Sequence, residues 1–342
     1  MTNEPLGVAL IGLDHWYAAL NLAAAATRSN LCHLVAVADD DEAHAHQVAR
    51  DYEAGIATTD YRAVLERGDV DIVVAMYSTD QNVAVCSAAA AAGKHIIGVK
   101  PMAMDLVGAG AIVEAVRSAG VIYLPFESSH RLMPTNQQIK RWIDEGRIGP
   151  PQRYLQTLHS SLPQAWPGSP SSGWWIDPAR VPGGGWIDHG IYAVDLVRWL
   201  FGATASEVLG VVARRRHPTL PVEDYGLATY TLSNHAVAII EDTWTAEQGF
   251  FFSRSEVVGS AGATLDETQT TGRIVVRGDF GFDTWVAFEQ QGSPAPSILD
   301  HMVACLRETA APIATAEDGR ANLAACLAFY QAAHTGASVR IG

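Results

Sequence analysis

The first third of the chain alternates short apolar runs with longer segments of helical periodicity. The apolar runs are nearly continuous and of strand length, which is typical of strands buried on both faces of a sheet. They cover residues 6–13, 33–38, 71–76, 95–99 and 121–126, and helical patterns cover residues 18–26, 42–52, 83–92 and 108–119 between them. Strands alternating with helices predict βαβ units. We therefore predict a doubly wound α/β domain with a parallel sheet over residues 1–124.

The pattern changes after Phe126. The predicted helices cover residues 136–144, 183–202, 298–308 and 316–333, and the predicted strands cover 153–159, 207–214, 225–233, 236–246, 251–258, 272–278 and 283–289. Successive strands separated by turn residues are typical of an antiparallel sheet. We expect residues 125–342 to form a second, α+β domain with an open, mainly antiparallel sheet.

One helix carries unusual polar residues. Three glycines, Gly183 to Gly185, run into an apolar helix in which Asp188, Tyr192 and Asp195 share one face at helical spacing. Paired carboxylates are costly to bury, so this face is interpreted as looking into a cleft. The alternative is that Asp188 only favours the positive end of the helix dipole and Tyr192 is an amphipathic surface ring.

Composition narrows the classes of function. The chain has 342 residues, 48% hydrophobic and 18% charged, with a formal net charge of -14. Nucleic acids and anionic membranes need clustered Lys and Arg, and the basic run here is the short stretch 214–216, so neither partner is expected. The cysteines Cys32, Cys86, Cys305 and Cys326 form no CxxC pair, and no secretory signal or membrane-spanning run is recognised, so a reduced, cytoplasmic setting is predicted.

Several ordered motifs resemble those of the Gfo/Idh/MocA oxidoreductase family. They are IGL at 11–13, AVAD at 36–39, AGKHIIGVKP at 92–101, HRLMP at 130–134, GRIG at 146–149, WWIDPARVPGGGWIDHGIYAVDLVRWLFG at 174–202, VEDYG at 222–226, VVGSAG at 257–262 and AEDGRANLAACLAFYQAAHTGASVRI at 316–341. The resemblance implies a Rossmann-like N-terminal domain that binds NAD(P), and a C-terminal domain for substrate binding and oligomerisation. It also implies hydride transfer between a nicotinamide cofactor and a sugar or polyol hydroxyl.

The resemblance also implies catalytic residues. The lysine of the family's Glu-Lys-Pro tripeptide falls on Lys100, and Pro101 biases Lys100 to an extended conformation at the carboxyl end of a strand, where crevices form. In the family's Asp-x-Gly-x-His motif, the aspartate matches Asp188 and the histidine position is Tyr192. We expect Tyr192 to be the general acid/base, with Lys100 lowering the phenol pKa from roughly 10. His189 is offset from the motif and is expected to be structural. The alternative is that a shift in the local register makes His189 the base.

The cofactor site departs from the dinucleotide fingerprint G-x-G-x-x-G. Gly12 is present, but Asp14 and Tyr17 occupy the other glycine positions, and a carboxylate at the second would repel a phosphate unless it turns away or meets His15. Asp39 stands 22 residues after Tyr17, about the spacing of a ribose-binding carboxylate, and the neighbouring acids favour NAD over NADP. A solvated acidic turn is the alternative. The predicted cofactor-binding residues are Gly12, Leu13, Asp14, Asp39, Asp40, Tyr77, Ser78, Val99 and Lys100.

The loop of residues 162–182 is long and rich in tryptophan. Indole faces suit the apolar faces of sugar rings, and long loops are often lids, although tryptophans also plug domain interfaces. The predicted substrate-binding residues are Lys100, His130, Trp175, Asp188, His189 and Tyr192. Glu127, His130 and His159 lack metal-ligand spacing, so no metal is expected.

Together these features predict an NAD-dependent oxidoreductase of a sugar, sugar derivative or polyol. One alternative keeps the NAD tightly bound, for transhydrogenation or redox-assisted glycoside cleavage. The other is a sugar-binding or partner-binding protein that has lost the cofactor. Alternating apolar positions at Val237, Ile239, Trp285 and Ala287 predict a sheet face that packs in a homodimer or homotetramer.

Overall fold

The computed structural model describes residues 4–266, 273–279, 282–289 and 297–342. Its N-terminal part holds a fully parallel sheet in the order β3-β2-β1-β4-β5-β6. The strands are β1 (Leu6–Ile11), β2 (Cys32–Ala38), β3 (Ile56–Thr58), β4 (Ile72–Ala75), β5 (His95–Gly98) and β6 (Tyr123–Pro125). The predicted doubly wound domain is confirmed, and the sequence pattern missed only its short edge strand, β3, and the short helix that follows it.

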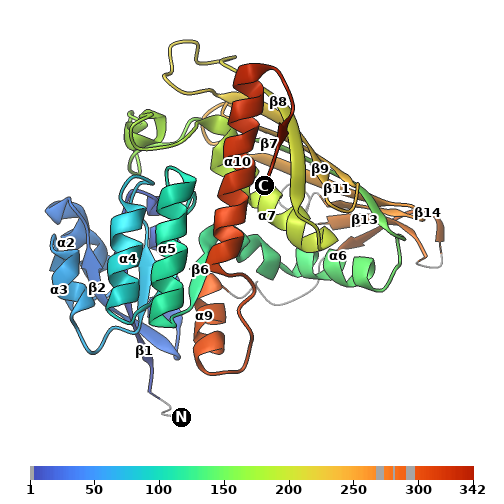
Figure 1. The fold of residues 1–342 in the computed structure, drawn as a ribbon. Coiled ribbons are helices and arrows are strands. Elements are labelled where there is room, and N and C mark those ends of the chain that lie inside the picture. Colours follow the sequence, from blue (N-terminus) through green and yellow to red (C-terminus); the bar gives the residue numbers. More distant parts are fainter. Residues whose placement is uncertain (1–3, 267–272, 280–281, 290–296) are drawn as a thin grey trace.

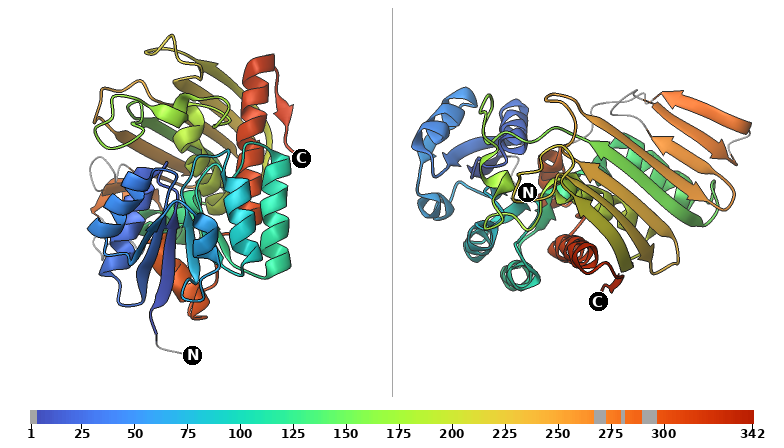
Figure 2. Two further views of the ribbon diagram at one scale, coloured as in Figure 1. Left: turned by 90° about the vertical axis from the view of Figure 1, so that its left-hand side faces the viewer. Right: turned by 90° about the horizontal axis from the view of Figure 1, so that it is seen from above.

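Helices cover both faces of this sheet (Figures 1 and 2). One face packs against α1 (Trp16–Arg28), α2 (Glu42–Asp51) and, from the far end of the chain, α9 (Ile298–Leu306). The other face packs against α3 (Tyr61–Leu65), α4 (Asn82–Ala91) and α5 (Leu106–Ala119). Because α9 returns to this core, the two domains share chain segments, and the predicted division at residue 124 stays a prediction.

The second sheet has nine strands, in the order β14-β13-β12-β11-β7-β10-β9-β8-β15. They are β7 (Pro151–His159), β8 (Ala205–Ala213), β9 (Tyr225–Leu232), β10 (Val237–Thr243), β11 (Phe252–Gly259), β12 (Ala263–Asp266), β13 (Arg273–Gly278), β14 (Phe282–Glu289) and β15 (Val339–Arg340). The β7–β10 pair is parallel and the other pairs are antiparallel. The predicted open, mainly antiparallel sheet is confirmed.

One face of the second sheet is covered by α6 (Pro134–Asp144), α7 (Gly185–Phe201) and α10 (Ala316–Thr335). Residues of β10 alternate as this arrangement requires, with Ala238, Ile240 and Asp242 buried toward the helices. The opposite face leaves Leu209 and Val211 of β8 half exposed, at 50% and 54%. Asp242 is therefore a carboxylate at a position where the strand otherwise places aliphatic side chains.

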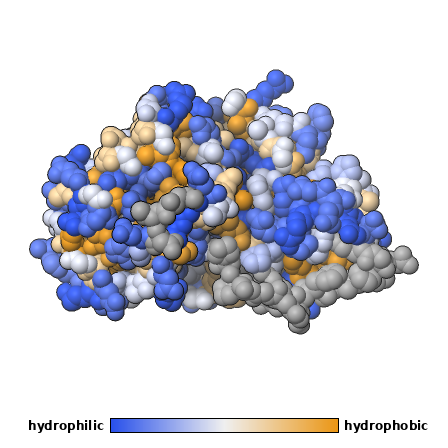
Figure 3. All heavy atoms as spheres, turned by 90° about the horizontal axis from the view of Figure 1, so that it is seen from below, coloured by the Kyte–Doolittle hydropathy of each residue, from blue (hydrophilic) through white to orange (hydrophobic). Residues whose placement is uncertain are grey.

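The surface of the molecule mixes hydrophilic and hydrophobic residues. Hydrophobic residues lie in small groups among hydrophilic ones on the face shown in Figure 3. Among the residues that the structure describes, no helix combines the length and apolar character needed to cross a bilayer.

A buried polar network ties three helices of the second domain together. Asp195 of α7 is fully buried and accepts from Arg131 Nε at 2.8 Å and Nη2 at 2.6 Å, from a short 3-10 helix, η1 (Phe126–Leu132). Asn322 of α10 and Ser128 donate to the same carboxylate, at 2.8 and 3.0 Å. The expectation that Asp195 faces a cleft was wrong, because its carboxylate is used to fix α7 against η1 and α10.

Replacing Asp195 by alanine tests this network. The change leaves the Arg131 guanidinium buried without its main partner, a situation that costs about 3–5 kcal/mol. We expect a loss of that size in the free energy of unfolding, measured by urea denaturation. Asp144→Ala, which breaks an exposed pair with Lys140, is the matched control and should leave the midpoint nearly unchanged. Equal effects of the two variants would contradict the assignment.

Candidate functional site

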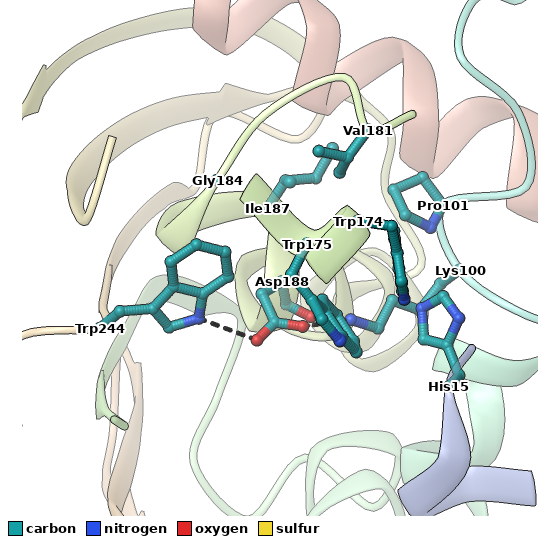
Figure 4. A pocket seen from close by; sticks show the side chains of 10 residues that line it. All are labelled: His15, Lys100, Pro101, Trp174, Trp175, Val181, Gly184, Ile187, Asp188 and Trp244. Atoms are coloured by element: carbon teal, nitrogen blue, oxygen red, sulfur yellow. Dashed lines mark hydrogen bonds and ion pairs between the residues drawn. The ribbon is translucent and has the colours of Figure 1, made fainter. Parts of the chain in front are cut away.

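Lys100 and Asp188 meet between the two domains (Figure 4). Lys100 follows β5, is 1% exposed, and its Nζ donates to the Asp188 carboxylate at 2.5 Å and to the Asp188 main-chain carbonyl at 2.5 Å. Trp244 Nε1 donates to the second carboxylate oxygen at 2.9 Å. Burial opposes the charged carboxylate, but His189, Lys100 and these hydrogen bonds outweigh it and hold the pKa of Asp188 well below its ordinary value.

The glycines before α7 allow its first turn to approach the sheet. A Cβ on Gly184 would lie 2.2 Å from the carbonyl oxygen of Glu223, so only glycine fits there. Glu223 then receives hydrogen bonds from the main-chain N–H groups of Gly184 and Trp186, and from Tyr330 Oη at 2.6 Å. A carboxylate at a helix N-terminus is stabilised by the helix dipole and its free N–H groups. Glu223 thus anchors the helix that carries Asp188, a role that the sequence analysis missed.

Tyr192 lies one turn beyond Asp188 in the same site. Lys100 Nζ sits over the face of its ring, 5.5 Å from the centroid, and the His130 ring lies 4.4 Å away. Burial, followed by the charges of Asp188 and Glu127, raises the phenol pKa well above its ordinary value. The prediction that Lys100 lowers this pKa was wrong, because the ammonium is paired with Asp188 and meets the ring face.

His130 and His189 complete the polar wall around Tyr192. Burial, then the charges of His189 and Lys100, lower the pKa of His130 to about 4, so its imidazole is neutral at ordinary pH. His189 Nδ1 lies 3.4 Å from Asp188 Oδ2 and 3.9 Å from Asp242 Oδ1. The structure therefore brings together the predicted substrate-binding residues, Lys100, His130, Trp175, Asp188, His189 and Tyr192, and adds Asp242 and Trp244. The sequence feature that could have indicated Asp242 is a carboxylate at a strand position that otherwise faces the core.

The turn after β1 keeps the geometry of a nucleotide-binding turn. Gly12 has φ +86°, and a Cβ there would lie 2.5 Å from the main-chain nitrogen of Tyr77. Leu13 N donates to Asp39 Oδ2 at 2.7 Å, and Asp41 N donates to Oδ1 at 2.9 Å. Asp39 therefore holds this turn together, and burial raises its pKa to about 6.

A cavity of about 260 Å³ opens beside this turn. It brings together the predicted cofactor residues Leu13, Asp14, Asp39, Asp40 and Tyr77, and adds Asp41, His44, Gln81, Ala165, Trp166 and Arg180. Trp166 stacks on His44, with ring centroids 3.8 Å apart. Val99 instead packs in the apolar core and lines neither this cavity nor the one beside Lys100. Aromatic and carboxylate groups thus line this cavity, and these are the groups that could hold an adenine ring and ribose hydroxyls.

Asp14, at the second glycine position, lines the cavity and is held by polar partners. Its Oδ2 accepts from Ser78 N at 2.7 Å and from Arg180 Nη2 at 3.2 Å, and Arg180 also donates to Ser78 Oγ at 2.5 Å. Burial raises the Asp14 pKa, against the opposing effect of these partners. The carboxylate is thus neutralised by Arg180 of the tryptophan-rich loop, and His15 is not its partner.

Two tryptophans of that loop fill the space between the turn and Lys100. Trp174 and Trp175, in a second 3-10 helix, η2 (Gly173–Ile176), have ring centroids 4.6 and 4.7 Å from the ring of the buried His15. Trp175 also stacks on Tyr17 at 5.8 Å, and Trp174 Nε1 donates to Asp14 O at 3.2 Å. The cavity left beside Lys100 is about 10 Å³, room for one water at most. The expected lid loop therefore occupies the interface itself.

Comparison with known proteins shows which family has this architecture. A sequence profile described as "Oxidoreductase family, NAD-binding Rossmann fold" matches residues 6–126, and one described as "GFO/IDH/MocA C-terminal domain" matches residues 136–264. An inositol 2-dehydrogenase of Rhizobium meliloti (strain 1021) is 30% identical over 239 residues, 69% of this chain and 68% of the relative. The chain belongs to the Gfo/Idh/MocA oxidoreductase family.

Two other proteins are similar over nearly the whole chain. The scyllo-inositol 2-dehydrogenase (NAD(+)) of Bacillus subtilis (strain 168) is 28% identical over 343 residues, covering 97% of this chain and 95% of the relative. The structure of a levoglucosan dehydrogenase in complex with NADH and L-sorbose superposes with a TM-score of 0.86 at 21% identity, over 99% of both chains. The second similarity shows that the fold is shared.

The raised pKa of Asp39 predicts a pH dependence of stability. A carboxyl group with a folded pKa of about 6 and an unfolded pKa near 3.9 binds its proton more tightly in the folded state, so stability is lost as pH rises from about 4 to about 6 and does not fall further above that. The wild type should gain stability relative to Asp39→Asn as pH falls from about 7 to about 5, because the buried charge is neutralised. Thermal unfolding at these pH values measures the difference, and a difference that does not change with pH would contradict the raised pKa.

Proposed function

We propose that the protein is an NAD-dependent oxidoreductase that transfers a hydride between a hydroxyl carbon of a sugar, sugar derivative or polyol and the nicotinamide. The observation that carries the proposal is the Lys100–Asp188 pair, held at the carboxyl edge of an NAD-binding Rossmann fold. In open α/β sheets, ligands bind outside the carboxyl ends of the strands. Relatives named as inositol and levoglucosan dehydrogenases support the substrate class.

In this proposal the adenosine lies in the cavity beside Asp39, Asp40 and Trp166. The bound cofactor supplies the hydride acceptor. Asp39 and Asp40 favour ribose hydroxyls over a 2′-phosphate, which makes NAD the preferred cofactor. Gly12, Leu13, Tyr77 and Ser78 shape the turn against which the cofactor lies.

The catalytic set in this proposal is Lys100, Asp188 and Tyr192. Lys100 holds the reacting oxygen of the substrate, and its ammonium stabilises negative charge that develops there. Asp188 orients Lys100, and its carboxylate accepts a hydrogen bond from a neighbouring hydroxyl of the substrate. Tyr192, kept as a protonated phenol by burial, donates a hydrogen bond to the substrate. His130, Trp175 and His189 form the rest of the substrate wall.

The proposal requires Trp174 and Trp175 to leave the reacting end when the cofactor enters, because the space beside Lys100 holds at most one water while they remain. The adenosine cavity is open in the same conformation. Part of the binding energy of the nicotinamide is therefore used to displace the indoles, which lowers the apparent affinity.

We further propose a cytoplasmic homo-oligomer, either a dimer or a tetramer. Four free, buried cysteines, Cys32, Cys86, Cys305 and Cys326, support a reducing compartment. The outer face of the second sheet supports an interface, with half-exposed Leu209 and Val211 and the partly buried Val237 and Ile239. The side chains of Trp285 and Ala287 lie outside the described part of the structure.

NADH titration tests the cofactor assignment. Wild-type protein should give a saturable change in tryptophan and nicotinamide fluorescence, and no saturation up to millimolar NADH would overturn the proposal. Trp174→Ala/Trp175→Ala should bind NADH about tenfold more tightly, because displacement is no longer needed. ADP-ribose, which lacks the nicotinamide, should bind both proteins alike. Trp199→Ala, away from the cavities, is the matched control. Equal NADH affinities of the double variant and the wild type would show that the nicotinamide does not have to displace the two indoles.

Catalytic roles are tested by conservative substitutions. Lys100→Met removes the ammonium and should slow turnover about a hundredfold or more, with NADH binding retained. Tyr192→Phe removes one oxygen and should cost about tenfold, the scale of one hydrogen bond. Single-turnover NADH formation with a panel of inositols and anhydro sugars measures both. A Lys100→Met protein with near-native turnover would remove Lys100 from the catalytic set.

A further inference from the structure

His189 lies between two carboxylates. Its Nδ1 is 3.4 Å from Asp188 Oδ2 and 3.9 Å from Asp242 Oδ1, and this nitrogen is buried without a hydrogen-bond partner. A quarter of the side chain stays exposed. One side of the imidazole thus faces buried acids, while the other part of the ring reaches the surface of the site beside Tyr192 and Phe251. Such distances shorten readily when a bound ligand orders the site.

Asp242 is not explained by packing. It is fully buried, its Oδ1 accepts from Thr243 N at 2.8 Å, and its Oδ2 has no hydrogen-bond partner among the residues that the structure describes. A buried, incompletely hydrogen-bonded carboxyl group is costly, and the neighbouring inward positions of β10 hold Ala238 and Ile240. Burial, then the charge of Asp188, raises the Asp242 pKa well above its ordinary value. Among the described residues, His189 approaches this carboxyl group, with its unpartnered Nδ1 3.9 Å from Asp242 Oδ1.

Other groups near the reacting end are poorly placed to accept a proton. Lys100 is held by two hydrogen bonds to Asp188, and Asp188 is held in turn by Lys100 and Trp244. The Lys100 ammonium lies over the ring face of Tyr192, not beside its hydroxyl, so it does not favour the phenolate. Hydroxyl oxidation nevertheless needs a proton acceptor, since the substrate loses its O–H proton as it loses the hydride.

We propose that His189 is the catalytic base and that Asp242 is the positioning residue that holds its Nδ1. This inference rests on the proposed function. In the oxidation, the substrate O–H proton passes to Nε2 of His189, the C–H bond breaks with its electron pair going to the nicotinamide, and the carbon–oxygen double bond forms. Nδ1–H donates to Asp242, whose carboxylate offsets the imidazolium charge, as the aspartate does in a Ser-His-Asp triad. In the reduction each transfer runs backwards.

The His189–Asp242 pair titrates in a charged environment. Because Asp242 is fully buried and the His189 Nδ1 is enclosed beside it, the two groups share one proton and ionise as a unit. The charged and titratable groups that act on the pair are Asp188 and Tyr192 from α7, Lys100 from the turn after β5, His130 from η1 and Glu241 from β10. Burial has the largest effect and lowers the pKa of His189; the charge of Asp188 raises it and the charge of Lys100 lowers it. A carboxylate at Asp242 acts in the same direction as Asp188.

Imidazole NMR of the cofactor-free protein tests the pair without relying on activity. The His189 signals are identified by their loss in His189→Gln. Asp242→Asn should lower the pH of His189 ionisation by about one unit, because the carboxylate that stabilises the imidazolium is gone. Tyr192→Phe should leave that ionisation in place. An ionisation that does not move in Asp242→Asn would overturn the pairing, whatever the protein does with NAD.

The pH profile of single-turnover NADH formation tests catalysis. The rate should rise with pH as the pair loses its proton. His189→Gln should abolish this rising limb of the pH profile and slow the reaction about a hundredfold or more, with NADH affinity retained. Asp242→Asn should move the limb to lower pH and slow the reaction less. If Tyr192→Phe lost the limb and His189→Gln kept it, the tyrosine would be the base. Absence of NADH binding in the wild type would instead overturn the proposed function, and the NMR result would still decide whether the pair exists.

Discussion

The ion pair between Lys100 and Asp188 is the constraint on which the rest of the site depends. Both groups are buried, at 1% and 7% exposure, and a buried charge is tolerated only when it is paired and hydrogen-bonded. Lys100 follows β5 of the parallel sheet, and Asp188 lies in the first turn of the helix that covers the second sheet. Each domain therefore completes the charge balance of the other, and the site exists only where the two meet.

Several devices keep that pair in register. Glu223 and the close-packed glycines fix the start of α7, and the Arg131–Asp195 network fixes its middle against η1 and α10. Trp244 holds the free oxygen of Asp188. Polar groups placed on rigid elements in this way are already oriented before a substrate arrives, which reduces the reorganisation that a reaction requires.

In the turn after β1, the departures from the dinucleotide fingerprint are compensated by residues of the tryptophan-rich loop. Asp14 and Tyr17 replace glycines of the dinucleotide turn, and their partners, Arg180 and Trp175, come from one loop of the other domain. Arg180 offsets the carboxylate, and the indole covers the phenol. The altered turn and the tryptophan-rich loop therefore form one packed unit, in which the adenosine cavity is open and the reacting end is filled.

The sequence by itself determined the two sheets, most helices and the family, because apolar periodicity and ordered motifs are local features of the chain. It also placed Lys100 at the carboxyl edge of the sheet and Asp188 on a helix entered through glycines. It could not assign partners. That Asp195 is buried against Arg131, that Lys100 is paired with Asp188 and leaves the Tyr192 pKa high, and that Asp242 reaches His189 from a distant strand depend on contacts between residues far apart in sequence. Burial and charge pairing set protonation states, and both are properties of the tertiary structure.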